Sequence, residues 1–263
     1  MRAAAILRRP QVSLRMAWRL WARNAFIYRR TYKLNILPNF FEPLLYLMAM
    51  GFGLGAYLSR VNGVRYIDFI APGLVAVSAM YGASFEVTWN CFFKMAERNV
   101  YDGCIATPLT IEDVALGEIL WGATRALIYG VTFLATASLF GVVHSWWALA
   151  APMAIGLVGL MFSVIGLTYT AVIQNMDFFA YYWTLFITPM FLFSGIFFPL
   201  DRLPGWVQSV AWFVPLHQAA RLMRALILQG DPWTALRAGL WLAIFTAALF
   251  LLPLNLLHRR MMQ

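Results

Sequence analysis

Six long apolar stretches constrain this chain more than any other feature of its sequence. Each is long enough to cross about 30 Å of hydrocarbon as a helix that rises about 1.5 Å per residue. Only 12% of the residues are charged and 62% are hydrophobic, whereas about a quarter of the residues of a soluble domain are charged. We therefore expect an all-α polytopic membrane protein with six transmembrane helices, at 36–58, 69–93, 119–143, 146–173, 178–198 and 236–257.

The composition excludes several other classes of protein. With 12 Pro, 18 Gly and 2 Cys in 263 residues, the chain is neither disordered, nor collagen-like, nor a small disulfide-stapled domain. The six spans use most of its length, so we expect one transmembrane domain over 1–263 and no soluble catalytic domain. The two cysteines, Cys91 and Cys104, are expected to be reduced and structural.

The N-terminal region is basic and amphipathic. The first 33 residues hold nine basic residues and no acid, and they lack the short apolar run and the cleavage site of a signal peptide. Over 13–33 the apolar residues recur at helical spacing, and Arg15, Arg19 and Arg23 form a separate row at steps of four. This pattern predicts an interfacial helix. The basic row is interpreted either as a topology anchor or as a contact for an anionic head group on the substrate path.

The segment 199–230 differs from the spans. It contains Pro199, and its apolar pieces are interrupted at Pro204-Gly205 and at Pro215. Each piece is too short to cross a membrane, so we expect an outer re-entrant helix pair. Placing both termini in the cytoplasm puts thirteen basic residues inside and six outside, and cytoplasmic loops carry the excess of Lys and Arg. We therefore expect both termini to be cytoplasmic.

The sequence offers no catalytic or metal constellation. It contains no Gly-Lys pair and thus no G-x-x-x-x-G-K-[S/T] loop for nucleotide phosphates. The three histidines are dispersed along the chain, so no metal site is expected. We therefore expect the chain to have no enzymatic activity by itself.

Few ionisable residues interrupt the spans. Glu86 lies well inside the second span, where it is interpreted either as part of a substrate path or as a structural hydrogen-bonding group. Glu42 and Arg125 lie near the ends of their spans and are expected to anchor the interface or to pair with each other.

The loop at 94–118 is the longest polar interruption on the expected cytoplasmic side. It holds five of the eleven acidic residues. Thr110 and Asp113 have the spacing of a capping box at the start of a short helix. The loop is interpreted either as a solvated hairpin or as a docking element for a soluble partner, since its mixed charges and Tyr101 exceed what a turn requires.

Two blocks of sequence resemble the ABC-2 type transporter permeases, and within them the nodulation protein J subfamily of lipooligosaccharide exporters. The first block holds Tyr101-Asp102, Ala106-Thr107-Pro108-Leu109, the run from Asp113 to Glu118, Trp121 and Ala123-Thr124-Arg125. The second runs from Phe193 to Pro204 and continues with Pro215-Leu216-His217 and Arg221.

This resemblance implies a homodimeric permease of the bacterial inner membrane that binds two copies of a separate ABC ATPase. The chain would bind no cofactor, because ATP and Mg would lie in the ATPase subunit, and it would have no nucleic-acid partner. The loop at 94–118 would be the coupling helix, with Arg98, Tyr101, Asp102, Gly103, Thr107, Pro108 and Leu109 contacting the ATPase. The pair Gly103-Cys104 departs from the family pattern after Asp102, and glycine weakens a helix by up to about 1 kcal/mol.

The function that we expect is ATP-driven export of a lipid-linked or acylated saccharide. An ABC permease for a hydrophobic drug or a lipid without sugar is the alternative, because the aromatic spans suit either cargo. An ATP-independent carrier or a membrane-embedded enzyme is less favoured, because ionisable residues are sparse within the spans.

Overall fold

The computed structural model describes residues 12–58, 60–61 and 63–262, apart from the side chains of residues 33–40, 42, 43, 97 and 202. The described chain is almost entirely helical, which confirms the all-α prediction. Its strands within those ranges are two residues each, β1 (Arg60–Val61) and β2 (Val64–Arg65), which pair antiparallel with Arg60 opposite Arg65.

Five helices of the described chain are long and apolar enough to cross a membrane, and they match the second to sixth expected spans. They run over Tyr66–Ala96, Ile111–Leu139, Trp146–Val172, Met176–Phe193 and Pro232–Met261. Within them lie α3 (Tyr66–Phe85), α5 (Ile111–Leu139), α6 (Ala151–Val172), α7 (Phe179–Tyr181), α8 (Thr188–Phe193), α11 (Pro232–Leu249) and α12 (Leu251–Met261).

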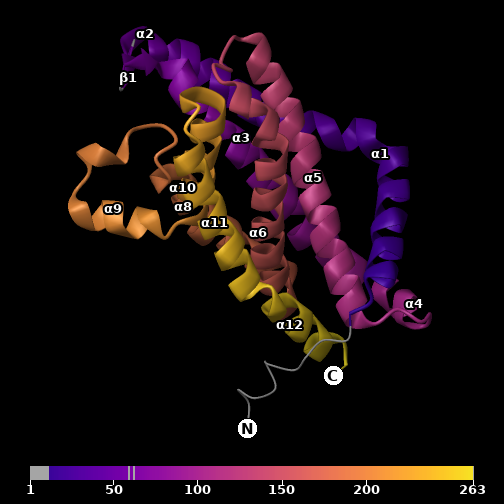
Figure 1. Cartoon of the computed structure of the whole chain (residues 1–263). Coiled ribbons are helices and arrows are strands. Elements are labelled where there is room, and N and C mark those ends of the chain that lie inside the picture. The colour runs from indigo at the N-terminus through magenta and orange to yellow at the C-terminus, as the bar shows by residue number, and fades with distance from the viewer. Residues whose placement is uncertain (1–11, 59, 62, 263) are drawn as a thin grey trace.

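The N-terminal region differs from the expectation of an interfacial helix followed by a separate span. A single helix, α1, covers Leu14–Met48, and a π-helical turn (Ala49–Leu54) and α2 (Gly55–Tyr57) continue it. Figure 1 shows α1 running alongside α5 and then turning across the top of the view toward α2. Of the expected span at 36–58, the structure describes a shorter apolar helix, Leu44–Tyr57. A sixth span therefore stays a prediction.

Helix α3 lies at the centre of the bundle. It packs against α5, α6 and α10 (Pro215–Arg224) and buries nearly all of its side chains. Small residues allow the helices to approach closely. A Cβ atom at Gly159 of α6 would lie 3.0 Å from the Cα atom of Ala123 of α5, so the α5–α6 contact requires glycine there.

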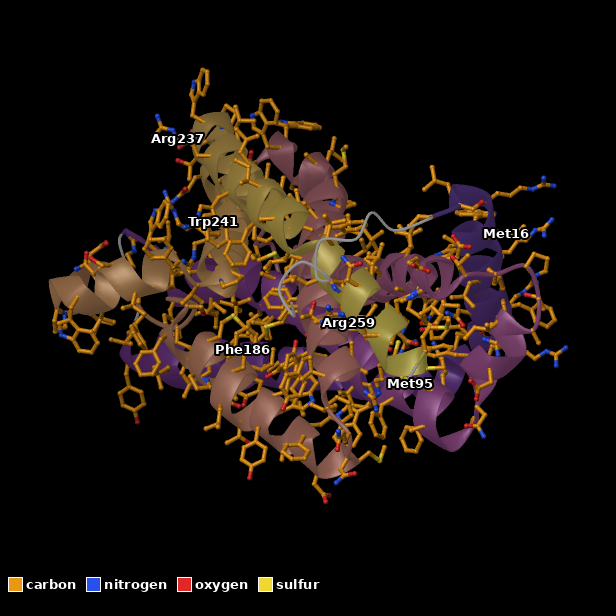
Figure 2. The ribbon with its side chains drawn as sticks, turned by 90° about the horizontal axis from the view of Figure 1, so that it is seen from below. Met16, Met95, Phe186, Arg237, Trp241 and Arg259 are labelled. Atoms are coloured by element: carbon orange, nitrogen blue, oxygen red, sulfur yellow. The ribbon has the colours of Figure 1, made fainter. Side chains whose placement is uncertain are left out.

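The two ends of the bundle carry different elements. The C-terminal end of α12 lies at the same end as α4 (Val100–Ile105), and the β1–β2 hairpin and α2 lie at the opposite end (Figure 1). Seen from the α4 end, Met16 of α1 and Met95 lie on one side of the bundle, and Trp241 and Arg237 of α11 lie on the other (Figure 2). Different elements therefore form the two ends of the bundle.

The segment at 199–230 forms short helices instead of a span. Its first helix, α9 (Gly205–Trp212), follows Pro204 and projects from the side of the bundle (Figure 1). Its second, α10, begins at Pro215, whose missing N–H suits a first helical position, and packs against α3 and α11. A π-helical turn (Ala225–Gln229) ends at Gly230, where φ is +64°.

Candidate functional site

Helix α4 is a short helix at one end of the bundle, with the single acid Asp102 on its exposed side. Asn99 precedes it with φ +46°, a left-handed conformation that asparagine tolerates better than most residues. Thr107 closes the helix by donating from its Oγ1 atom to the Cys104 carbonyl at 2.6 Å. Asp102 and Gly103 are exposed, so α4 presents a polar face to its surroundings.

The rest of the predicted coupling residues lie on the same element or beside it. Arg98, Thr107 and Pro108 are exposed, and Leu109 is half-buried. Tyr101 is the exception, because it points inward and is 1% exposed. Most of the predicted coupling residues in this turn-helix-turn are therefore exposed, and Tyr101 is buried.

Tyr101 connects α4 to the bundle. Its side chain lies next to Cys91 and Glu118, and burial raises the pKa of its hydroxyl well above the ordinary value. Tyr101 is therefore uncharged at physiological pH. A displacement of α4 would reach the ends of α3 and α5 through this ring.

The capping-box prediction is confirmed, although the helix it begins is the long α5 and not a short one. The Thr110 side chain accepts from the Asp113 N–H at 3.2 Å, and the Asp113 Oδ2 atom accepts from the Thr110 N–H at 3.0 Å. Asp113 Oδ1 also accepts from the Ser13 N–H at 2.6 Å. The start of α1 is thereby fixed to the start of α5.

Four charged residues form a cluster that we call the ionic network: Glu86, Glu118 and Arg125, which are buried, and Lys94, which is half-buried. Lys94 Nζ lies 3.1 Å from Glu86 Oε1 and 2.8 Å from Glu118 Oε2. Arg125 Nε lies 3.3 Å from Glu86 Oε2. The two acids are balanced by two bases, which lowers the cost of placing charge inside the bundle.

The helix geometry explains how the network assembles. Two π-helical turns, Glu86–Asn90 and Phe93–Glu97, follow α3, and such turns occur frequently at functional sites. Asn90 Nδ2 donates to Glu86 Oε2 at 2.8 Å, and Lys94 reaches the same carboxylate from the next turn. Residues spaced four apart therefore share one row along the helix.

Sequence reasoning singled out Glu86 but missed its partners. Arg125 pairs with Glu86, whereas the side chain of Glu42, its other expected partner, lies outside the described residues. Glu118 was grouped with the acids of a loop, yet α5 begins at Ile111 and Glu118 is 0% exposed inside it. The signal that could have found the network is the spacing of Glu86, Asn90 and Lys94.

The three arginines expected on the substrate path lie on α1 and do not join the ionic network. Arg15 and Arg19 are exposed, and Arg23 donates to the Asn24 Oδ1 atom at 3.3 Å. The opposite face of α1 packs on α5, where Trp21 Nε1 donates to Thr124 Oγ1 at 2.8 Å. The row therefore faces away from α5.

A cavity of about 560 Å³ opens between α1 and the network, and we call it the α1–α5 cavity. Glu86, Lys94 and Arg125 contribute to one wall. The Arg125 guanidinium lies over the Tyr28 ring, 4.4 Å from its centroid, and the Tyr28 ring meets Trp121 edge-on at 5.6 Å. The lining residues are Asn24, Ile27, Tyr28, Thr31, Glu86, Asn90, Phe93, Lys94, Arg98, Trp121 and Arg125.

The segment at 199–230 holds a second polar cluster at a distance from the ionic network. Arg224 donates to the carbonyls of Phe69, Gly195 and Ile196 at 2.6 to 3.2 Å. His217 Nδ1 lies 2.8 Å from the Ser194 carbonyl, and burial lowers its pKa. These bonds attach α10 to the end of α8. Pro199, Pro204, Gly205 and Pro215 bound the short helices around them.

Comparison with known proteins gives a consistent family. The model of the ABC-2 type transporter family matches residues 16–228. Nodulation protein J of Rhizobium leguminosarum bv. viciae is 38% identical over 93% of this chain and 94% of its own length. Nodulation protein J of Bradyrhizobium diazoefficiens is 32% identical over 93% of each chain. The inner membrane transport permease YadH of Escherichia coli (strain K12) is 27% identical over 75% of this chain and 77% of its length.

Proposed function

Because this chain belongs to the ABC-2 type transporter family, we propose that it is the permease of an ABC exporter that moves a lipid-linked or acylated saccharide across the bacterial inner membrane. Its multi-pass helical bundle suits a membrane component of a transporter. The observation that carries the proposal is the likeness to nodulation protein J, which extends over 93% of the chain. YadH, a relative named as an inner membrane transport permease, supports the location.

A separate ABC ATPase drives the transport in this proposal and holds the ATP and Mg. It docks on α4, where Asp102, Thr107 and Pro108 are exposed. Tyr101 passes the movement of α4 to Glu118, and the ionic network carries it to α1, α3 and α5. A cytoplasmic location of both termini is part of this proposal. It is supported by the end of α12, which lies at the α4 end of the bundle, and by the start of α1, where the Ser13 N–H donates to Asp113 at the start of α5.

Two copies of the chain and two of the ATPase form the exporter in this proposal. The helix Met176–Phe193 supports dimerisation, because it keeps large apolar side chains exposed. Tyr181, Leu185 and Phe193 are all more than half exposed. The same aromatic surface suits a hydrophobic drug or a lipid without sugar, which is the second candidate cargo.

Site-specific crosslinking tests the docking site. A photoreactive residue replaces Asp102 in the full chain, and a matched control replaces the exposed Trp146 at the opposite end of the bundle. We expect crosslinks to the purified ABC ATPase from position 102 and none from position 146. Equal crosslinking at both positions would remove α4 as the docking site.

ATP-dependent export from vesicles tests the substrate path. We expect Glu86→Gln to slow export, because it removes the charge that balances Lys94 and Arg125. We expect the double change of Arg15 and Arg19 to Ala to slow export of an anionic cargo. Each cation contributes about 1 kcal/mol to the free energy of binding at an anionic surface. Wild-type rates in both variants would remove these residues from the path.

A further inference from the structure

Residues that line the α1–α5 cavity carry buried polar atoms that form no hydrogen bond within the described structure. Asn24 is 4% exposed, and its Nδ2 atom has no acceptor within the described structure. The buried Tyr28 hydroxyl likewise has no partner there. Leaving such a group buried and unpaired costs about 1–3 kcal/mol. Two of these groups on adjacent turns of one helix, lining one cavity, indicate that a polar ligand completes the site.

We propose that the α1–α5 cavity binds the sugar head group of an amphipathic glycoside. Asn24 Nδ2 and the Tyr28 hydroxyl would bond to sugar hydroxyls, and the ring of Trp121 would pack against the sugar. The Asn24 amide supplies two donors, and a hydroxyl both donates and accepts. The volume of about 560 Å³ falls in the usual range of small-molecule sites.

The charges of the cavity favour a hydroxyl-rich ligand over a bare anion. Lys94 is already paired with Glu86 and Glu118, at 3.1 and 2.8 Å. The charge of Arg125 is balanced by Glu86, although the Nε–Oε2 contact of 3.3 Å is no hydrogen bond, and its guanidinium lies over the Tyr28 ring. The deep wall therefore offers hydrogen bonds and an aromatic surface, whereas Arg98 stays exposed at the mouth.

The mouth of the cavity favours a ligand that also carries an apolar chain. Ile27 is 47% exposed and Phe93 is 41% exposed, and both line the cavity. An alkyl or acyl chain could lie between them while the head group reaches Asn24 and Tyr28. An amphipathic molecule matches this polar interior and apolar rim.

This inference deepens the proposed export function and rests on it for the direction of transport, but its test needs neither transport nor the ATPase. The full chain is placed in phosphatidylcholine nanodiscs without ATPase. The probe is octyl β-glucoside that carries a diazirine on its sugar. After illumination, we expect labelled peptides that contain residues 24–31 and 121–125. Unlabelled octyl β-glucoside should compete, and octyl phosphocholine, with the same tail, should not.

Variants separate binding in the cavity from general adhesion. Tyr28→Phe removes one hydroxyl and keeps the ring contacts with Arg125 and Trp121. We expect Tyr28→Phe to weaken the affinity of octyl β-glucoside, measured by competition, about two- to tenfold. This is the effect expected from the loss of one hydrogen bond. The matched control is Tyr57→Phe, which makes the same change at a residue that is 90% exposed. It should leave the affinity unchanged.

The outcomes are distinct. Equal competition by octyl phosphocholine, labelling spread over all lipid-facing helices, or an unchanged affinity in Tyr28→Phe would overturn the proposal. Free glucose that competes as well as octyl β-glucoside would overturn the amphipathic ligand in favour of a soluble sugar. Weaker competition by free glucose would support a glycolipid. Specific labelling of a chain that binds no ABC ATPase would support glycoside binding in the cavity. It would contradict the proposal that the chain is part of an ABC exporter. The two failures are therefore distinguishable.

Discussion

Replacing Lys94 by methionine tests whether the ionic network holds the bundle together. The change keeps an unbranched side chain, one heavy atom shorter, and removes the ammonium that lies between Glu86 and Glu118. Two buried carboxylates then lose their shared counter-charge. Breaking a buried ion pair costs about 3–5 kcal/mol. The Lys94 side chain is 19% exposed, so water screens part of the loss, and we expect about 3 kcal/mol.

Thermal unfolding in detergent, followed by tryptophan fluorescence, measures this loss. For a chain of this size, 1 kcal/mol corresponds to about 2–4 °C, so we expect the melting temperature to fall by about 6–12 °C. The double variant Lys94→Met/Glu118→Gln should recover part of the loss, because it also removes one of the stranded charges. The control Arg15→Met changes an exposed residue and should shift stability by less than about 0.5 kcal/mol.

Two results would refute this reasoning. A melting temperature within 2 °C of wild type, about 1 kcal/mol or less, would mean that water already solvates the cluster. Strictly additive losses in the double variant would mean that Lys94 and Glu118 do not interact, despite a separation of 2.8 Å.

Three further predictions concern other parts of the molecule. Thr110→Ala removes the capping bond at the start of α5 and should cost about 1 kcal/mol in a chemical denaturation curve. Gly117→Ala would bring a Cβ atom 2.9 Å from the Ala17 carbonyl, so we expect α1 to lose protection from proteolysis and the fold to lose about 1–3 kcal/mol. Burial lowers the pKa of His217, so the folded state favours the neutral ring, and stability should fall as the pH drops below about 6.5. His217→Gln should make the melting temperature less sensitive between pH 8 and pH 5.5, and an equal sensitivity would contradict this assignment.

Much of the fold follows from the hydropathy of the sequence. The second to sixth expected spans appear as helices, because apolar runs of this length satisfy their backbone bonds best as helices. The expected boundary between an interfacial helix and a first span does not appear, because α1 continues from Leu14 to Met48. Local helix propensity does not explain this continuity, because Pro38, Asn39 and Pro43 all disfavour a helix interior.

The candidate site was only partly predictable. The role of Asp102 and Thr107 in contacting an ATPase stays a prediction from the family resemblance. The structure places both residues on the surface, as expected for polar residues that interrupt the hydropathy. Lys94 and Glu118 were assigned to a loop, because charge in a sequence favours exposure. Only the packing of α3 against α5 brings them within 2.8 Å of each other. The cavity beside Tyr28 depends on how α1 lies against α5, which no local pattern specifies.

Reconstitution of the full chain in proteoliposomes, with and without its purified ABC ATPase, tests the central claim most directly. The measured quantity is the rate at which a fluorescent glycolipid reaches the opposite leaflet. We predict movement that requires both the ATPase and ATP, and that is abolished when α4 is altered by Tyr101→Ala in a chain that still folds. Equal rates from the chain alone would contradict the account, because it assigns the energy source to another subunit.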